Sequence, residues 1–520
     1  MNSKSRRSSY ILLIIVSISF LLRVYHLEDT PLEYDEAIWG NIARNVLEKG
    51  MYCRNIWQFP IFVDHPPVHL YHMVLSFMVG GVSTLSLRLP TIIISLFLIF
   101  LFYEIYRHLE LTGAEEGSLL AALLVGTLPY GITMSRSSHV EISVLFYGTL
   151  ALLLLLKYRH SAHLSLFFGS GVAFSLSMFC KFLGFLFILP LLLLIFNVCR
   201  ISTAPGPARF RLLKQVTLFC SGVALGSIVV NLVLASQINF SLIDFYRGVL
   251  QKFLNIIIAS EVSVSPWRTY ELEKFINSLH RNYYPAFILG MIAGFISFFQ
   301  LLGDVINRTD QPHRPRKVLL TELVLFLSST SFICLLCFGS EATRNVNYAF
   351  IVLPFYCLLV ISVFYRLILQ LSGTRVGVKY PQLLRIIKVV IFLLFLGLIV
   401  QGFFLENSWE IQPEKEHFKE IARQIMVLTK QNQYVIINPY GPEISFLTNR
   451  PYNFLYTCQN LDEVKTRLKR AKAVVLKKET LPHFSDPDMQ ILMRLIKRRF
   501  KHITTVGDVD IYKRRGIRNK

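Results

Sequence analysis

The sequence predicts an all-α polytopic membrane protein that carries a small soluble α/β domain at its C-terminus. Two observations predict the membrane part. Hydrophobic residues make up 53% of the 520 positions, and apolar runs of roughly 17 to 23 residues recur along the chain, the length that a helix needs to cross a bilayer. The third observation is a change of pattern after residue 405, where short strand-like runs alternate with amphipathic helical stretches.

The formal net charge of +21 raises the question of a nucleic-acid partner. The basic residues lie mostly in short loops between the predicted spans and in the last hundred residues. Membrane topology and anionic lipids account for that distribution better than nucleic acid does, because cytoplasmic loops collect Lys and Arg. We therefore expect membrane lipids, and no nucleic acid, among the partners.

The first apolar run, residues 10–24, follows Lys4, Arg6 and Arg7, and no small-residue cleavage site comes after it. This indicates a retained signal-anchor span with a cytoplasmic N-terminus. The predicted inside loops are then the basic ones, for example those with Arg107, Arg308 and Arg366. We predict about eleven spans, at residues 10–26, 88–106, 117–134, 141–157, 162–179, 182–198, 215–236, 284–302, 319–338, 348–368 and 386–404.

This topology makes residues 1–405 a transmembrane domain whose first outer loop is residues 27–87. Residues 406–520 form an extracytoplasmic domain, with strands expected at 434–438, 473–476 and 510–512 and helices at 414–428, 462–472 and 489–500. The apolar stretch 68–82 is short and contains Gly80 and Gly81. We interpret it as a re-entrant or juxtamembrane helix; a full span there is the alternative and would invert everything downstream.

Asp35 and Glu36 stand at the start of an outer segment in which Ile38, Ile42 and Val46 recur at helical spacing. The simplest interpretation is a capping aspartate on an interfacial helix. Capping is compatible with catalysis, because a carboxylate held at a helix start is oriented to accept a hydrogen bond from an attacking hydroxyl. Ionisable groups at a membrane rim are costly, which favours a functional role.

Further charged and polar candidates lie in the predicted outer regions. Arg136 and Glu141 flank the next outer turn, where a local ion pair is the simpler explanation. Lys181 interrupts two apolar runs, and snorkelling to the interface is its alternative to anion binding. Arg344 precedes a predicted span, and an arginine fork suits phosphate oxygens. His65, His69 and His72 share a helical spacing suited to metal ligands, but packing in the polar zone is the more typical role, and a phosphate contact suits His65 better.

An outer-face site has no supply of nucleotide-activated sugars or ATP. The chain also lacks G-x-x-x-x-G-K-[ST] and a strand-borne G-x-G-x-x-G that would hold such donors. Any activated donor should therefore be linked to a lipid.

These motifs form an ordered series: Tyr34-Asp35-Glu36, Asp64-His65-Pro66-Pro67, Arg88-Leu89-Pro90, Ser135-Arg136 with Glu141, Lys181 at a broken helix, and Arg344, Tyr348 and Pro354. In this order, over residues 10–405, the chain resembles the GT-C integral-membrane glycosyltransferases. It resembles most the branch of the protein O-mannosyltransferases and lipid A aminoarabinose transferases.

The resemblance implies an inverting transferase that takes a sugar from an undecaprenyl- or dolichyl-phosphate donor at the outer or lumenal membrane face. It implies Asp35 as the general base, with Glu36 and Glu141 as further acidic residues of the catalytic centre. The implied donor-phosphate ligands are Lys181, Arg344, His65, Arg88 and Arg136, and Tyr348 matches a substrate-binding position. No cofactor is expected; a divalent metal, held by Asp35 and Glu141, is the alternative.

Two positions depart from the family pattern. His65 stands where some relatives have lysine, so a phosphate contact there depends on the imidazole N–H or on protonation. Glu141 stands where many relatives have aspartate. A transporter or flippase of a lipid-linked or anionic substrate is the competing function, but transporters place ionisable groups near the membrane midplane. We expect the acceptor to be a lipid, a glycan or a protein, and we expect the protein to lie in a bacterial plasma membrane.

Overall fold

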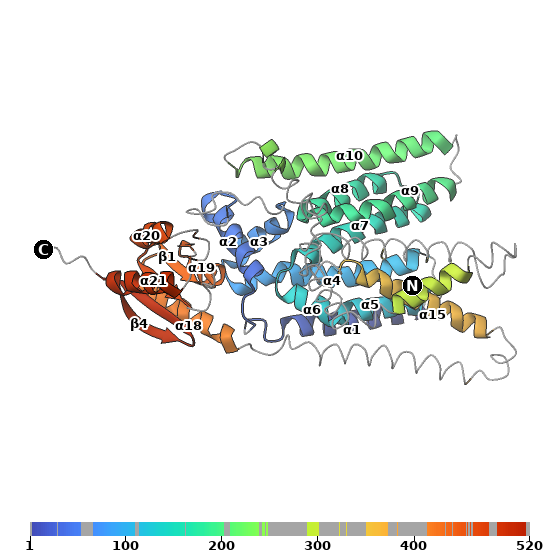
Figure 1. The fold of residues 1–520 in the computed structure, drawn as a ribbon. Helices are drawn as coiled ribbons and strands as arrows, with labels where there is room; N and C mark the ends of the chain where they lie inside the picture. Colours follow the sequence, from blue (N-terminus) through green and yellow to red (C-terminus); the bar gives the residue numbers. More distant parts are fainter. Residues whose placement is uncertain are drawn as a thin grey trace.

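The computed structural model describes residues 3–53, 66–238, 242–247, 289–300, 350–372, 413–477 and 486–515, with short gaps inside these ranges, and the isolated positions 322, 329 and 382. Figure 1 shows an elongated bundle of helices with the C-terminal domain at one end, beside α2 and α3. Most of the described residues are helical, and several of the described helices are strongly apolar.

The helices that precede the C-terminal domain include α2 and α3, which we call the outer helices because they lie at the end of the bundle beside that domain (Figure 1). In chain order, the helices before that domain are α1 (Ser3–Val24), α2 (Tyr34–Lys49), α3 (Val68–Gly80), α4 (Thr84–His108), α5 (Ala114–Thr127), α6 (Pro129–Arg136), α7 (Val140–Ser161), α8 (Ser165–Cys180), the 3₁₀ helix η1 (Phe182–Phe187), α9 (Ile188–Ile201), α10 (Ala208–Ala235) and α15 (Leu353–Ser372).

Four described helices are long and apolar enough to cross a membrane: α1, α4, α7 and α10. The predicted span 117–134 is not one straight helix, because α5 and α6 meet at an angle of 51° around Leu128 and Pro129. The predicted span 182–198 begins as the 3₁₀ helix η1. Spans predicted at 319–338 and 386–404 lie outside the described residues, apart from the isolated positions 322 and 329.

Helix α8 lies between α7 and α10 in the bundle. Its contact with α10 depends on two glycines, since a Cβ atom at Gly171 would lie 2.0 Å from the carbonyl oxygen of Phe219 and one at Gly222 would lie 2.1 Å from that of Phe168. The backbones of the two helices therefore touch, which is the close packing that small residues permit between membrane helices.

The apolar stretch after Pro67 forms α3, a helix of 13 residues. At 1.5 Å per residue it rises about 20 Å, less than the hydrocarbon thickness of about 30 Å. This length agrees with the predicted juxtamembrane helix. Helix α3 packs against α2, so the described part of the predicted first outer loop contains two packed helices.

The predicted topology placed Arg366 in an inside loop, but in the structure it lies within a helix. It lies in α15 with 1% of its side chain exposed, and its Nη2 is 2.7 Å from Oε2 of the buried Glu322. Ser362 and Ser297 also donate to the two oxygens of Glu322. The pair buries both charges together, which the sequence pattern could not show because the partners are 44 residues apart.

The C-terminal residues form a five-stranded sheet with the order β2-β1-β3-β5-β4. The strands are β1 (Val435–Asn438), β2 (Tyr452–Asn453), β3 (Ala473–Leu476), β4 (Phe500–Val506) and β5 (Val509–Arg514). Strands β2, β1 and β3 run parallel, while β5 and β4 are antiparallel to their neighbours. The three predicted strands correspond to β1, β3 and β5, whereas β2 and β4 were not predicted.

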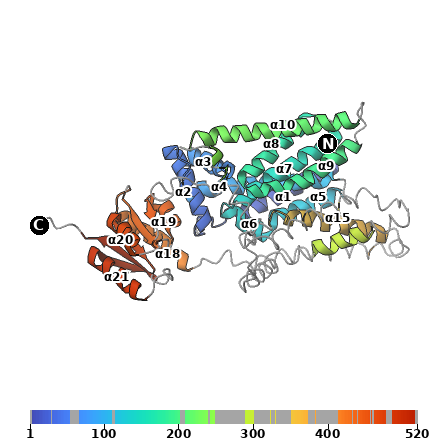
Figure 2. The same ribbon diagram turned by 45° about the horizontal axis from the view of Figure 1, so that its top comes forward.

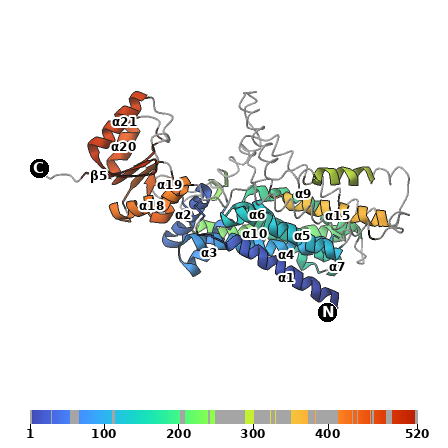
Figure 3. The ribbon, with the colours of Figure 1, turned by 90° about the horizontal axis from the view of Figure 1, so that it is seen from below.

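Helices cover both faces of this sheet: α18 (Pro413–Leu428), α19 (Gly441–Thr448), α20 (Leu461–Arg470) and α21 (Asp486–Arg499). Alternate residues of β1 point to opposite faces: Val435 and Ile437 pack with α18 and α19, and Ile436 packs with α20 and α21. Helix α19 also contacts α2, so the C-terminal domain sits on the outer helices of the bundle (Figures 2 and 3).

Candidate active site

Helix α2 begins with three acidic residues that have three different environments. Glu33 is the N-cap, and its backbone N–H donates to Oε2 of Glu36 at 3.2 Å. Asp35 lies in the first turn and is exposed, so it is not the capping residue that the sequence suggested. Among the described residues, none hydrogen-bonds to or forms an ion pair with the Asp35 carboxylate.

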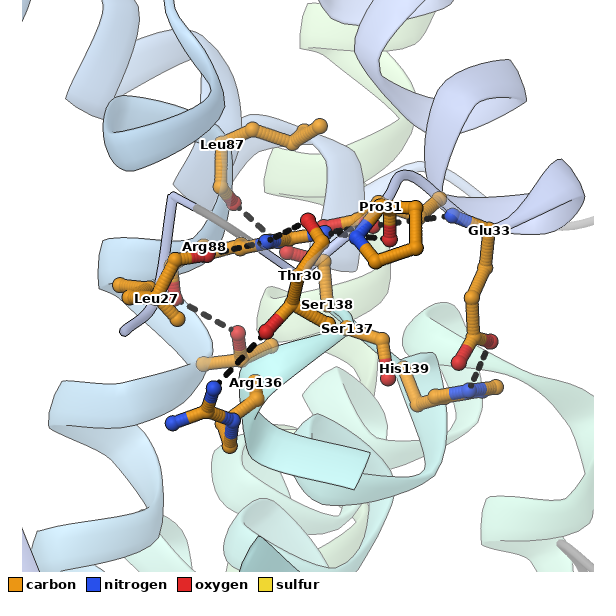
Figure 4. A network of polar contacts seen from close by, with 12 residues as sticks. Leu27, Thr30, Pro31, Glu33, Leu87, Arg88, Arg136, Ser137, Ser138 and His139 are labelled. Carbon is orange, nitrogen blue, oxygen red and sulfur yellow. Dashed lines mark hydrogen bonds and ion pairs between the residues drawn. The ribbon is translucent and has the colours of Figure 1, made fainter. Parts of the chain in front are cut away.

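Glu36 is buried and engaged by Arg88 of α4. Arg88 Nε lies 2.6 Å from Oε1 of Glu36 and Nη2 lies 2.8 Å from Oε2, and both side chains have 0% exposure. Arg88 also donates to the backbone carbonyls of Leu27, Thr30 and Pro31 (Figure 4). This bidentate pair ties the start of α2 and the preceding loop to α4.

Arg136, at the end of α6, has a structural role comparable to that of Arg88, because it also donates to several backbone carbonyls. Its guanidinium donates to the carbonyls of Leu22, Arg23 and Tyr25, at the C-terminal end of α1, and to Oγ1 of Thr30. The last carbonyls of a helix lack partners and carry partial negative charge, so an arginine there stabilises the helix end. Figure 4 shows Arg136 and Arg88 on either side of Thr30.

A chain of charged groups connects the start of α2 to the break after α8. Nε2 of His139 is 3.1 Å from Oε2 of Glu33, and Nδ1 of His139 is 3.7 Å from Oε2 of Glu141. Oε1 of Glu141 accepts a hydrogen bond of 2.7 Å from Nζ of Lys181. Lys181 follows α8 in extended conformation, where η1 begins. The turn with Glu141 therefore lies beside the start of α2.

His139 is charged in this arrangement. Burial lowers the pKa of its imidazole, but the carboxylates of Glu141 and Glu33 outweigh burial and raise that pKa to about 10. A protonated His139 between two carboxylates keeps the total charge low, which lets three ionisable groups share one partly buried turn.

The histidines of α3 have packing roles, the more typical of the two alternatives. Nδ1 and Nε2 of His69 are 2.9 Å from Oγ of Ser143 and 3.0 Å from the carbonyl of Ser138, while His72 pairs with the hydroxyl of Tyr147 at 2.8 Å. Among the described residues, no three His, Cys, Asp or Glu side chains are grouped so as to hold a metal ion.

The structure thus brings together Asp35, Glu36, Arg88, Glu141 and Lys181 at one end of the bundle. Three predicted site residues lie outside the described residues: His65, Arg344 and Tyr348. Sequence reasoning missed Glu33 and His139. Their only signal was position, one residue before the Tyr34-Asp35-Glu36 motif and inside the short turn between Arg136 and Glu141.

Comparison with known proteins shows what the chain is similar to. A family model described as dolichyl-phosphate-mannose-protein mannosyltransferase matches residues 64–233. The fold is similar to ArnT from Cupriavidus metallidurans bound to undecaprenyl phosphate, with a TM-score of 0.61 and 14% identity over 96% of this chain and 97% of ArnT. It is also similar to the archaeal oligosaccharyltransferase AglB from Archaeoglobus fulgidus, with a TM-score of 0.54 and 13% identity over 100% of this chain and 75% of AglB.

One curated relative is "Putative mannosyltransferase YycA" of Bacillus subtilis strain 168, with 24% identity over 46% of this chain and 32% of that protein. The chain aligns with about a third or less of the length of the curated relatives. Together the findings support a GT-C glycosyltransferase, which confirms the resemblance drawn from the ordered motifs. The chain is similar in sequence to the mannosyltransferase family model and to the curated relative, and its fold is similar to that of ArnT.

Proposed function

We propose that this protein is an inverting glycosyltransferase that moves a hexosyl or pentosyl group from a polyprenyl-phosphate donor to an acceptor hydroxyl. The family-model match and the GT-C fold support transfer from a lipid-linked donor. The acceptor is a lipid, a glycan or a protein. The reaction takes place at the outer face of a membrane, which we assign to the bacterial plasma membrane.

The observation that carries the proposal is the contrast between Asp35 and Glu36. Glu36 is fully buried in a bidentate pair with Arg88, whereas the adjacent Asp35 is exposed on the same helix turn. The pair fixes the start of α2, so Asp35 is an accessible carboxylate on a rigid support. A general base needs both properties, because it must reach the proton of an incoming hydroxyl in a defined geometry.

In the proposed reaction the acceptor oxygen attacks the anomeric carbon of the donor sugar while Asp35 takes the hydroxyl proton. A new carbon–oxygen bond forms on one side of the anomeric carbon, and the bond to the phosphate oxygen breaks on the other. The single displacement inverts the anomeric configuration. The polyprenyl phosphate leaves with an additional negative charge, which nearby cations stabilise.

Lys181 is our candidate for the described cation that contacts the donor phosphate. Its ammonium lies 2.7 Å from Glu141, which positions it at the break between α8 and η1, and 11% of its side chain is exposed. Arg88 and Arg136 have several protein acceptors each, so we assign them to support of the site. Arg344, His65 and Tyr348 remain proposed contacts from outside the described residues.

The position of the C-terminal domain supports the proposed sidedness. Its helix α19 contacts α2, so the domain lies at the same end of the bundle as Asp35. An odd number of spans with a cytoplasmic N-terminus places that end outside the cytoplasm. The proposed catalytic face and the C-terminal domain are therefore both extracytoplasmic.

The test uses the purified full chain with a panel of undecaprenyl- and dolichyl-phosphate sugars, and consumption of the donor is measured. Asp35→Asn should abolish transfer while the protein remains folded and inserted. Asp462→Asn, on α20 and also exposed, is the matched control and should keep its activity. Full activity of Asp35→Asn, or no consumption of any donor by the wild type, would contradict the proposal.

A further inference from the structure

The C-terminal domain makes a buried and specific contact with α2. Nδ2 of Asn41 donates to the carbonyl of Pro442 at 2.8 Å, and Nη2 of Arg44 donates to the carbonyl of Phe446 at 2.6 Å. Asn41 and Arg44 each have 6% exposure. The partners are about 400 residues apart in the chain, so the contact joins its two ends.

Arg44 acts on the end of α19. The carbonyls of Ser445 and Phe446 belong to the last turn of that short helix. The carbonyl of Ser445 already accepts the backbone N–H of the C-cap residue Asn449 at 2.8 Å, whereas that of Phe446 is one of the last carbonyls, which have no partner within the helix. Arg44 donates to both and adds a positive charge at the negative end of the helix dipole. Its guanidinium carbon also lies 4.9 Å from the centre of the Phe446 ring, a cation–π contact.

Phe446 fills the space between the outer helices. Its ring stacks on Phe77 of α3 with a centroid distance of 6.3 Å, and only 3% of the residue is exposed. On α2 it lies against Gly40: a Cβ atom there would lie 2.6 Å from the Phe446 ring and 3.2 Å from Leu87 of α4. Glycine at position 40 is therefore what allows the aromatic ring to reach the helix.

The contacts begin about one and a half turns of α2 after Asp35, at Gly40, and extend to Arg44, about two and a half turns after it. Gly40 is five residues after Asp35 and on the same continuous helix. The Glu36–Arg88 pair fixes the first turn of α2 from the bundle side, and α19 holds the next turns from the domain side. A helix held at both places has a defined axis and a defined rotation, which together set the direction of an exposed side chain on its first turn.

We infer that the C-terminal domain positions α2 for catalysis, with Gly40, Arg44 and Phe446 as positioning residues for the base Asp35. The inference rests on the proposed function for its effect on turnover. Independently of the proposed function, we predict that the contact with α19 protects the amides of α2 from hydrogen exchange. Motion of α19, for instance when the domain meets an acceptor, would be transmitted to Asp35 through this contact.

The first test compares Phe446→Leu with Phe500→Leu in the purified full chain. Both phenylalanines are buried in or beside the C-terminal domain, but Phe500 packs with α20 and α21, away from α2. Phe446→Leu should increase hydrogen exchange of the amides at residues 37–42. It should also lower kcat by up to about 100-fold, the effect of a misplacement of about 1 Å, with the donor KM unchanged. Phe500→Leu should change neither.

The second test is a double-mutant cycle. Gly40→Ala should lower kcat more than Phe446→Leu does, because the added methyl group meets the aromatic ring. Combining Gly40→Ala with Phe446→Leu should recover part of that loss, since the smaller side chain makes room for the methyl group. Additive effects in the cycle, or exchange of α2 that is the same in Phe446→Leu and Phe500→Leu, would overturn the inference.

The two proposals fail in different ways. Activity of Asp35→Asn would remove Asp35 as the base and leave the exchange results to decide whether α19 orders α2. Unchanged exchange and kcat in Phe446→Leu would remove the positioning role and leave the base assignment intact. If Gly40→Ala does not fold, Arg44→Gln provides the same comparison, because it removes the bonds to the last carbonyls of α19.

Discussion

Glu36 and Asp35 are adjacent, and the structure predicts that neutralising one affects stability and neutralising the other affects turnover. Glu36→Gln leaves Arg88 buried without its counter-charge, while both side chains have 0% exposure. Removing one partner of a buried ion pair costs about 3–5 kcal/mol. Arg88 keeps its bonds to three carbonyls, so we expect the lower end, about 3 kcal/mol.

The assay is thermal or denaturant unfolding of the detergent-solubilised protein, followed by tryptophan fluorescence, to which the buried Trp39 of α2 contributes. Asp35→Asn should stay within about 0.5 kcal/mol of the wild type, because its side chain is exposed. Arg88→Met should cost more than Glu36→Gln, because it leaves the buried Glu36 carboxylate unpaired and also removes the donor to three backbone carbonyls. Wild-type stability of Glu36→Gln alone would refute the reasoning.

Two further predictions concern the charged groups between α2 and Lys181. Because the folded pKa of His139 is raised to about 10 and an unfolded histidine titrates near about 6.5, its contribution to stability is complete below about pH 6.5 and is lost as the pH rises to about 10. Wild-type Tm should therefore fall over this window more than that of His139→Gln, and equal slopes would contradict the ion network. Lys181→Gln should raise the donor KM and lower kcat, whereas Lys157→Gln, outside the proposed site, should change neither; unchanged donor kinetics of Lys181→Gln would remove Lys181 from the phosphate site.

Much of the fold follows from local pattern. Apolar run length predicted α1, α4, α7 and α10, and the period-2 and period-3.6 patterns after residue 405 predicted β1, β3, α18, α20 and α21 within a few residues. Strand β2 has only two residues and exists through its pairing with β1. Helix α19 has eight residues and is held by contacts with α2. Such short elements carry too little local signal to be predicted.

The bend between α5 and α6 had a local signal, Pro129, which lies at the start of α6. Proline lacks an N–H and clashes with the preceding turn, so it begins a helix readily and interrupts one that continues through it. Hydropathy alone does not register that effect, because the apolar composition continues across the bend. The stretch predicted as one span at 117–134 is therefore a bent pair of helices, α5 and α6, which together remain apolar enough to cross a membrane.

Composition and spacing were enough to predict the membrane class, the order of the motifs and the end of the bundle at which the charged residues gather. Which of these charged residues have structural roles could be seen only from the contacts in the folded chain. Arg88 forms an ion pair with Glu36, which is 52 residues away in the sequence, and Asn41 donates a hydrogen bond to the carbonyl of Pro442, which is 401 residues away. Whether a charge is buried and paired, like Glu36, or exposed, like Asp35, depends on such distant partners, and no local pattern records them.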